Sequence, residues 1–197
     1  LESTGFVINP YDPCVANRMK NGSQHTIVFH VDDVMSSHVD KKVNERFARW
    51  LEKKYGQHSP VTIHTGKVHD YLGMIFDYSK KGQVEVDMKS YVKDMIESFP
   101  ERMKMIDIAL TAASNNLFEE SKGKMLNKEK REIFHKIVAK GLFLAKRARP
   151  DILPTIAILS TRVAKPTESE WNKLRRLIRY LNGTRNKKLT IQAEKQS

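Results

Sequence analysis

The stretch I-V-F-H-V-D-D-V-M-S-S, residues 27–37, holds two adjacent carboxylates, Asp32 and Asp33, between apolar neighbours. The flanking runs, 24–31 and 34–39, have the character of strands. We therefore expect a tight hairpin with the two carboxylates at its tip. The pair has two interpretations at this point. Asp commonly forms turns by hydrogen-bonding its own backbone, whereas two carboxylates on a stiff support suit a hard divalent cation such as Mg²⁺.

Outward from this hairpin, strands and helices mix. Residues 14–20 resemble a strand and are followed by Asn-Gly, a turn signal. Residues 41–56 have helical apolar spacing, 61–88 read as further strands around a Lys-Gly turn, and 90–99 form a short helix. This mixture predicts an α+β fold.

The second half of the chain changes character. Residues 100–124 show weak periodicity and are expected to be a linker or loosely attached connection. Three helices follow, over 127–148, 150–164 and 167–183. Asp151 is the expected N-cap of the second helix, and Thr167 with Glu170 matches a capping box at the start of the third. The third helix also has an apolar stripe that is expected in the core, formed by Trp171, Leu174, Ile178 and Leu181.

These patterns predict three regions: residues 1–99, a connector over 100–126, and a basic helical region over 127–197. The chain has 197 residues and a net charge of +12, of which residues 141–197 carry 13 Lys and Arg against 4 Asp and Glu. Such a surplus favours a polyanion partner such as nucleic acid, and the alternative is a solvated Lys/Arg face without a ligand. The cations on the polar side of the third helix are Lys173, Arg175, Arg176 and Arg179.

Several classes of protein are excluded or disfavoured. No apolar run approaches the roughly 20 residues of a membrane span, so no membrane partner is expected. The single Cys14 cannot form an internal disulfide, and no targeting signal is visible, which fits an intracellular setting, a cytoplasmic particle or the nucleus. The seven His residues lack zinc-ligand spacing, and no phosphate-binding glycine loop occurs.

Several motifs together carry a family resemblance. H-V-D-D, residues 30–33, resembles the Y-V-D-D box of reverse transcriptases. D-Y-L-G-M-I-F-D-Y (70–78), the R-P-D-I that ends at residue 152, and K-P-T followed by R-Y-L-N-G-T (165–184) occur in the order found in copia-type retrotransposon polyproteins. The resemblance covers about residues 1–191. It implies part of a polymerase palm, an antiparallel sheet with helices, followed by a helical thumb-like region.

The resemblance also implies roles for particular residues. Asp32 and Asp33 would be the catalytic, metal-binding carboxylates of a site that uses two Mg²⁺ ions in the intact parent enzyme. His30, which stands where the family has Tyr, would lie near the primer end. The four cations of the third helix would contact template–primer phosphates, and dNTPs would be the substrates.

The same comparison leaves parts of the family pattern without a counterpart. The first catalytic Asp segment, the fingers and the RNase H segment are expected to belong to a longer polyprotein, so this chain alone is expected to be inactive. Two alternatives stay open: a non-catalytic nucleic-acid-binding remnant that uses the basic C-terminal helices, and a structural interaction protein whose charge serves solubility only.

Overall fold

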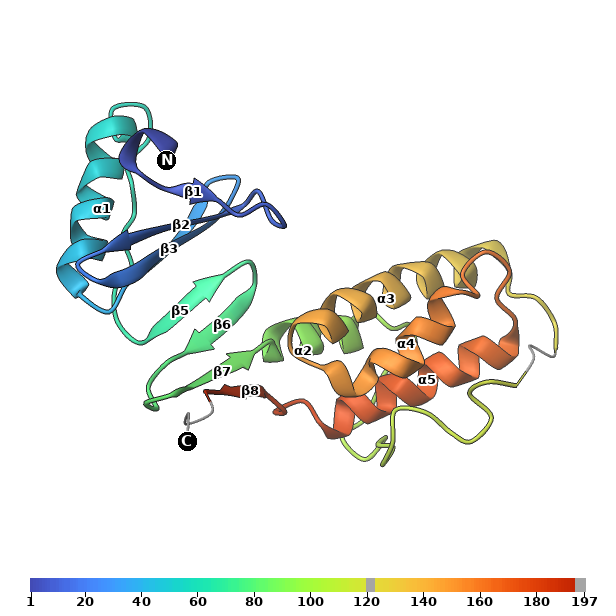
Figure 1. Ribbon diagram of the computed structural model, residues 1–197. Coiled ribbons are helices and arrows are strands. Elements are labelled where there is room, and N and C mark those ends of the chain that lie inside the picture. Colours follow the sequence, from blue (N-terminus) through green and yellow to red (C-terminus); the bar gives the residue numbers. More distant parts are fainter. Residues whose placement is uncertain (120–122, 194–197) are drawn as a thin grey trace. The chain divides into compact units, whose positions relative to one another are not determined.

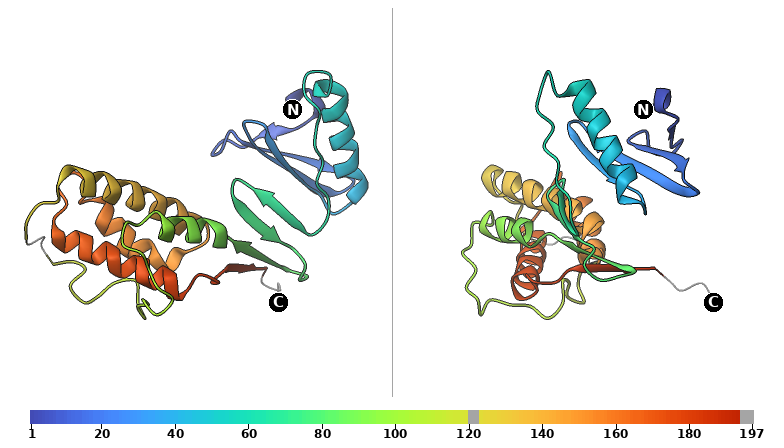
Figure 2. Two further views of the ribbon diagram at one scale, coloured as in Figure 1. Left: turned by 180° about the vertical axis from the view of Figure 1, so that it is seen from behind. Right: turned by 90° about the vertical axis from the view of Figure 1, so that its left-hand side faces the viewer.

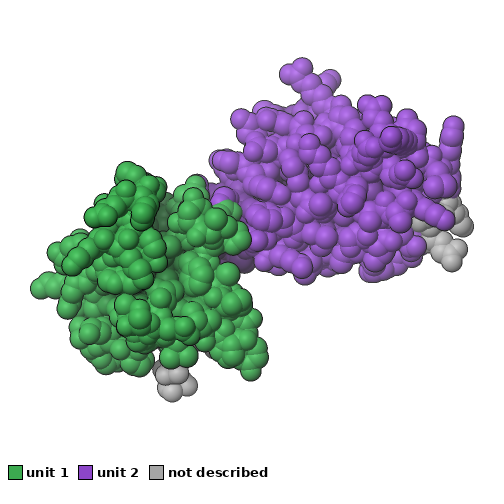
Figure 3. All heavy atoms as spheres, turned by 90° about the horizontal axis from the view of Figure 1, so that it is seen from above, with its two compact units in different colours: residues 1–72 green, residues 73–197 purple. Residues whose placement is uncertain are grey.

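A computed structural model describes residues 1–119 and 123–193. The chain divides into two compact units, Leu1–Leu72 and Gly73–Ser197 (Figure 3). Each unit has its own apolar core and combines antiparallel strands with helices, which confirms the α+β class. The division falls after Leu72, inside the stretch 1–99 that the sequence patterns group as one region. No helix in the described ranges is long and apolar enough to cross a membrane.

The N-terminal unit is built on an antiparallel sheet. Its strands lie in the order β1 (Val7–Ile8), β2 (Val15–Lys20), β3 (Ser23–His30) and β4 (Asp33–Ser37). The short 3-10 helix η1 (Glu2–Thr4) precedes the sheet, and β5 (Val68–Tyr71) ends the unit. Asn21 and Gly22 join β2 to β3 with positive φ angles of 52° and 74°. Positive φ at both positions is what a tight two-residue hairpin needs, so the predicted Asn-Gly turn is confirmed.

Helix α1 (Lys41–Tyr55) lies against this sheet (Figure 1). Ala16 of β2 and Ile27 of β3 are paired across the sheet and fully buried, and Phe47 of α1 packs against them. The side chain of Asp40 caps the helix by accepting the N–H of Lys42 at 2.9 Å. The helical spacing seen in the sequence therefore marks the face that covers the sheet.

A polar network crosses this core. His25 is fully buried, and its Nδ1 accepts a hydrogen bond from Arg18 Nε at 3.3 Å. Its Nε2 lies 2.9 Å from Ser36 Oγ, which donates to Asn44 Oδ1 at 2.8 Å. Burial, and then the charges of Arg18 and His38, lower the pKa of His25 to about 4. The neutral ring therefore joins β2, β3, β4 and α1 through hydrogen bonds.

The C-terminal unit combines a small sheet with a group of helices. Its elements are β6 (Met74–Asp77), β7 (Gln83–Asp87), α2 (Lys89–Glu97), α3 (Lys128–Arg147), η2 (Pro150–Ile152), α4 (Leu153–Ser160), α5 (Glu168–Gly183) and β8 (Leu189–Gln192). Strand β8 pairs antiparallel with β7, so the last described strand returns to the start of the unit (Figures 1 and 2). The connection from α5 to β8 thereby closes the unit.

The helices of this unit enclose its apolar core. The predicted stripe on α5 is confirmed, because Trp171, Leu174, Ile178 and Leu181 are all buried. The capping box of Thr167 and Glu170 is also present. In α3, a Cβ atom added at Gly141 would overlap the Ile156 side chain of α4. Glycine at this position therefore permits the close approach of α3 and α4.

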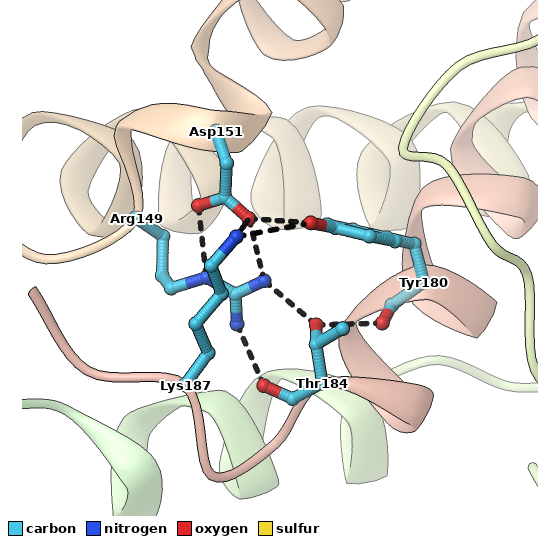
Figure 4. A network of polar contacts seen from close by, with 5 residues as sticks. All are labelled: Arg149, Asp151, Tyr180, Thr184 and Lys187. Carbon is cyan, nitrogen blue, oxygen red and sulfur yellow. Dashed lines mark hydrogen bonds and ion pairs between the residues drawn. The ribbon is translucent and has the colours of Figure 1, made fainter.

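The predicted role of Asp151 as a helix N-cap is wrong. The 150–164 segment forms η2 and then α4, and the residue that precedes α4 is Ile152, without a side-chain cap. The Asp151 carboxylate instead accepts hydrogen bonds from Arg149 Nε at 3.0 Å and Tyr180 Oη at 2.7 Å (Figure 4). Lys187 Nζ adds a third donor at 3.2 Å. A carboxylate with these partners is not available to cap a helix.

Arg149 is the centre of this network. Its side chain is 1% exposed, and it also donates to the carbonyl and the hydroxyl of Thr184, at 3.0 and 2.7 Å (Figure 4). Burial alone would raise the pKa of Asp151, but the hydrogen bonds from Arg149 and Tyr180 and the charge of Arg149 hold it well below its usual range. The network ties the start of α4 to the C-terminal end of α5.

The segment between α2 and α3, predicted as a linker or loosely attached connection, makes side-chain contacts with α5. Its described part has no helix or strand of its own, yet it is bound along α5. Glu101 accepts Trp171 Nε1 at 2.9 Å and forms a two-point contact with Arg175 at 2.5 and 2.6 Å. Asn182 Nδ2 donates to the Lys104 carbonyl at 2.8 Å. Polar side chains of α5 thus hold a segment that lacks its own periodic structure.

Candidate functional site

The hairpin of β3 and β4 has the geometry expected from the sequence. His30 pairs with Asp33 across the two strands, which leaves Val31 and Asp32 as a two-residue turn. His30, Asp32 and Asp33 are all exposed. The structure therefore brings the three predicted residues together on one tip, with Asp33 as the first residue of β4.

Val31 gives this tip an unusual backbone. Its φ angle is 55°, in the left-handed region, and its side chain is 89% exposed. For a β-branched residue this conformation costs about 1–2 kcal/mol. Strained backbone of this kind collects at functional sites. The hairpin thus presents its carboxylates to solvent on a turn that is not optimised for stability.

Two further residues adjoin this site, Tyr71 and Asp12. The Tyr71 hydroxyl is buried and has no hydrogen-bond partner within the described ranges. Burial raises its pKa, and the charges of Asp33, Cys14 and Asp12 raise it further. The carboxylates of Asp33 and Asp12 therefore lie close enough to the Tyr71 hydroxyl to affect its pKa. Neither residue is among the predicted site residues, although Tyr71 belongs to the motif over residues 70–78 that carries the family resemblance.

The donor set at the tip fits part of a magnesium site. Adjacent carboxylates are hard oxygen ligands, and Mg²⁺ is often bound by one or two carboxylates together with water and substrate phosphates. Over residues 1–119 and 123–193, however, no group of three or more His, Cys, Asp or Glu is placed to hold a metal ion. Asp32 and Asp33 could therefore supply a share of the ligands of such a site, but not a complete set for two ions.

The four predicted nucleic-acid-binding cations differ in their surroundings. Lys173 is buried and donates to the Glu119 carbonyl at 3.2 Å. Arg175 is held by Glu101, which raises the pKa of its guanidinium. Arg176 is half-buried, and within α5 Arg179 is the exposed member of the four. Much of the positive charge on α5 is therefore directed toward the connecting segment rather than toward solvent.

Comparison with known proteins gives one relative of interest. The chain is 28% identical over 187 residues to the "Putative transposon Ty5-1 protein" of Saccharomyces cerevisiae. The match covers 94% of this chain but 58% of the yeast protein, so the chain spans little more than half of that relative's length. No family model and no solved structure matches the chain. The similarity supports a relation to transposon proteins.

Proposed function

We propose that the chain is a segment of a copia-type retrotransposon reverse transcriptase that contains the metal-binding hairpin and the helical region after it. The observation that carries this proposal is the placement of Asp32 and Asp33, exposed together on a strained two-residue turn. The H-V-D-D box and the similarity to a yeast transposon protein support the same assignment. The activity of the intact parent is RNA-directed DNA synthesis.

In this proposal the residues of the hairpin orient the reacting groups. Asp32 and Asp33 would hold Mg²⁺, and a bound ion would supply activation of the attacking hydroxyl and neutralisation of charge on the leaving pyrophosphate. His30, exposed beside them, contacts the primer end. Exposed Arg179 contacts backbone phosphates of the template–primer, in a salt-sensitive way that does not depend on base sequence.

The chain by itself is expected to be inactive, because two-metal transfer needs carboxylates from more than one part of a protein. The test is Mg²⁺-dependent primer extension on an RNA template, with this chain and with a chain extended upstream in its own reading frame. We expect extension by the longer chain only. Asp32→Asn should abolish it, whereas Asp94→Asn, which removes an exposed carboxylate from α2, should not.

Extension by the isolated chain well above a boiled control, lost in Asp32→Asn, would contradict the predicted inactivity. Metal binding has an independent readout. Mn²⁺ should broaden the amide NMR signals of Val31 and Val34 in the native chain and in Asp94→Asn, but much less in Asp32→Asn. Equal broadening in all three proteins would show that the hairpin carboxylates do not bind the metal ion.

The second candidate function is non-catalytic nucleic-acid binding. The observation that favours it is the charge of the C-terminal part, 13 cations against 4 carboxylates over residues 141–197. Here the longer chain would also be inactive, while both chains would bind an RNA–DNA duplex with an affinity that falls steeply between 50 and 200 mM salt, by roughly 10³-fold if about six phosphates are contacted. Absence of salt-dependent binding would leave the charge with a role in solubility.

A further inference from the structure

A group of exposed apolar side chains lies in the segment that connects α2 to α3, drawn yellow-green in Figure 1. Met105, Ile106, Ile108 and Leu110 are between 54% and 89% exposed. We call these four residues the apolar turn. Single exposed apolar residues are common on protein surfaces, whereas a cluster of them marks an interaction site.

The backbone of the apolar turn is fixed by α5. Asn182, which is 6% exposed, donates through Nδ2 to the carbonyls of Lys104 and Asp107, at 2.8 and 2.9 Å. The Asp107 carboxylate accepts the Lys104 N–H at 2.8 Å, which closes the turn on itself. Ile108 lies against Gly183, where an added Cβ would come within 3.2 Å of the isoleucine side chain. The apolar side chains are therefore held toward solvent before any partner arrives, which reduces the entropy that binding must overcome.

A hollow adjoins the apolar turn at the C-terminal end of α5. It has a volume of about 490 Å³ and is lined by Met105 and by residues 182–187. Sites that enclose apolar groups commonly have volumes of about 300–1,000 Å³. The hollow is therefore large enough to receive an apolar side chain of a partner, and the flexible Met105 can adapt to its shape.

The charges around the apolar turn are mainly positive. Arg102 and Lys104 are exposed and directly precede it, and the half-buried Arg185 lines the hollow. Asp107, the carboxylate within the turn, is half-buried and already accepts a backbone N–H. In a two-fold contact between copies of this chain, both partners would present the same positive surface. Charge complementarity therefore favours an acidic partner over a second copy.

The backbone of the apolar turn also limits how a partner can bind. A peptide that adds a strand needs a free sheet edge. Residues 100–119 contain no strand, and the carbonyls of Lys104, Ile106 and Asp107 accept hydrogen bonds within the chain. The partner must therefore satisfy its own backbone groups, as an α-helix does. An amphipathic helix also gathers its apolar side chains on one face.

We infer that the apolar turn, together with the hollow beside it, binds an acidic amphipathic helix of a partner protein. Apolar side chains of that helix cover Met105, Ile106 and Leu110, and its carboxylates face Arg102 and Lys104. Such a contact has the apolar centre and polar rim of protein–protein interfaces. The inference is independent of polymerase activity, because it depends on this surface alone.

The test is an NMR titration of the whole chain, labelled in its Met and Ile methyl groups, with a synthetic peptide. The peptide has about 18 residues, or five helical turns, with Leu and Phe on one helical face and Glu on the other. The Met105 and Ile106 methyl signals, assigned from their loss in Met105→Leu and Ile106→Val, should move saturably. A peptide with the same residues in scrambled order has the same charge but no apolar face, and its half-saturation concentration should be at least about tenfold higher.

Matched variants separate the apolar turn from general effects of charge and hydrophobicity. With the Met105 methyl as the readout, Ile106→Ser should raise the half-saturation concentration at least about tenfold. Val39→Ser, which removes a side chain of similar exposure, 85%, from the N-terminal unit, should leave it unchanged. Lys104→Glu should raise it about threefold or more at low salt, whereas Lys89→Glu, which reverses an exposed charge at the start of α2, should not.

The inference is overturned if the amphipathic peptide leaves the methyl signals still, or if the two peptides act alike. In the first case, three titrations identify another occupant. Signals that move with protein concentration alone indicate a second copy, those that move with vesicles of phosphatidylcholine and phosphatidylserine indicate a membrane surface, and those that move with an RNA–DNA duplex indicate nucleic acid. None of these measurements uses primer extension, so failure of the proposed polymerase function is recognised separately.

Discussion

Removal of the charge of Asp151 is expected to destabilise the C-terminal unit strongly. In Asp151→Asn, the Arg149 guanidinium keeps its place, with 1% of the side chain exposed, but loses its counter-charge. Loss of one partner of a buried ion pair costs about 3–5 kcal/mol. Because the Asp151 side chain is itself 21% exposed, we expect the lower end, about 3 kcal/mol.

The two tryptophans allow the effect to be measured in one unit. Trp171 is buried in α5, whereas Trp50 belongs to α1 of the other unit. In a Trp50→Phe background, urea unfolding followed by the remaining fluorescence reports on the C-terminal unit. With a typical slope of about 2 kcal/mol per molar urea, Asp151→Asn should lower the midpoint by about 1.5 M.

Two variants act as controls for this prediction. Asp94→Asn removes an exposed carboxylate from α2 and should change stability by less than about 0.5 kcal/mol. Tyr180→Phe removes one donor to Asp151 and should cost about 1.5 kcal/mol or somewhat more. If Asp151→Asn costs no more than Asp94→Asn, the network of Figure 4 does not stabilise the unit, and the reasoning fails.

Three further predictions concern single positions. The folded pKa of His25, about 4, lies below its unfolded pKa, so at a pH between these two values the unfolded state binds more protons than the folded state. The stability of the N-terminal unit therefore decreases as the pH is lowered. From pH 7 to 5 the N-terminal unit should lose about 2 kcal/mol in urea unfolding followed by Trp50 in a Trp171→Phe background; a flat profile would contradict this. Val31→Asn should stabilise the same unit by about 1 kcal/mol, since Asn tolerates positive φ; no gain in the urea midpoint would mean that the turn is unstrained. Gly141→Ala should cost the C-terminal unit about 1–3 kcal/mol through overlap with Ile156, and an unchanged Trp171 transition would show that the helices can separate.

The candidate site was predictable in part. The position of Asp32 and Asp33 at a hairpin tip follows from a few neighbouring residues. Strand-like sequence lies directly before and after the pair, so the two strands can be joined only by a tight turn. The proximity of Asp12 and Tyr71 was not predictable in this way. These residues lie far apart in the sequence, and only folding of the N-terminal unit buries the Tyr71 hydroxyl near the Asp12 carboxylate.

Local features of the fold were determined by the sequence itself. The Asn-Gly turn, the capping box at Thr167 and the buried stripe of α5 each depend on residues within one turn or a few helical turns. Their physical causes are backbone conformational preference, end-group hydrogen bonding and helical periodicity. All three act over short separations, so they are visible in the order of the residues.

Only the tertiary structure decided the partners of the charged side chains. Arg175 and Glu101 are 74 residues apart, and Asp151 and Tyr180 are 29 apart. A carboxylate beside a helix start satisfies the rule for an N-cap whether or not an arginine is buried next to it. Which donor it accepts depends on the packing of distant helices, because a charge removed from water needs its partner wherever the fold places one.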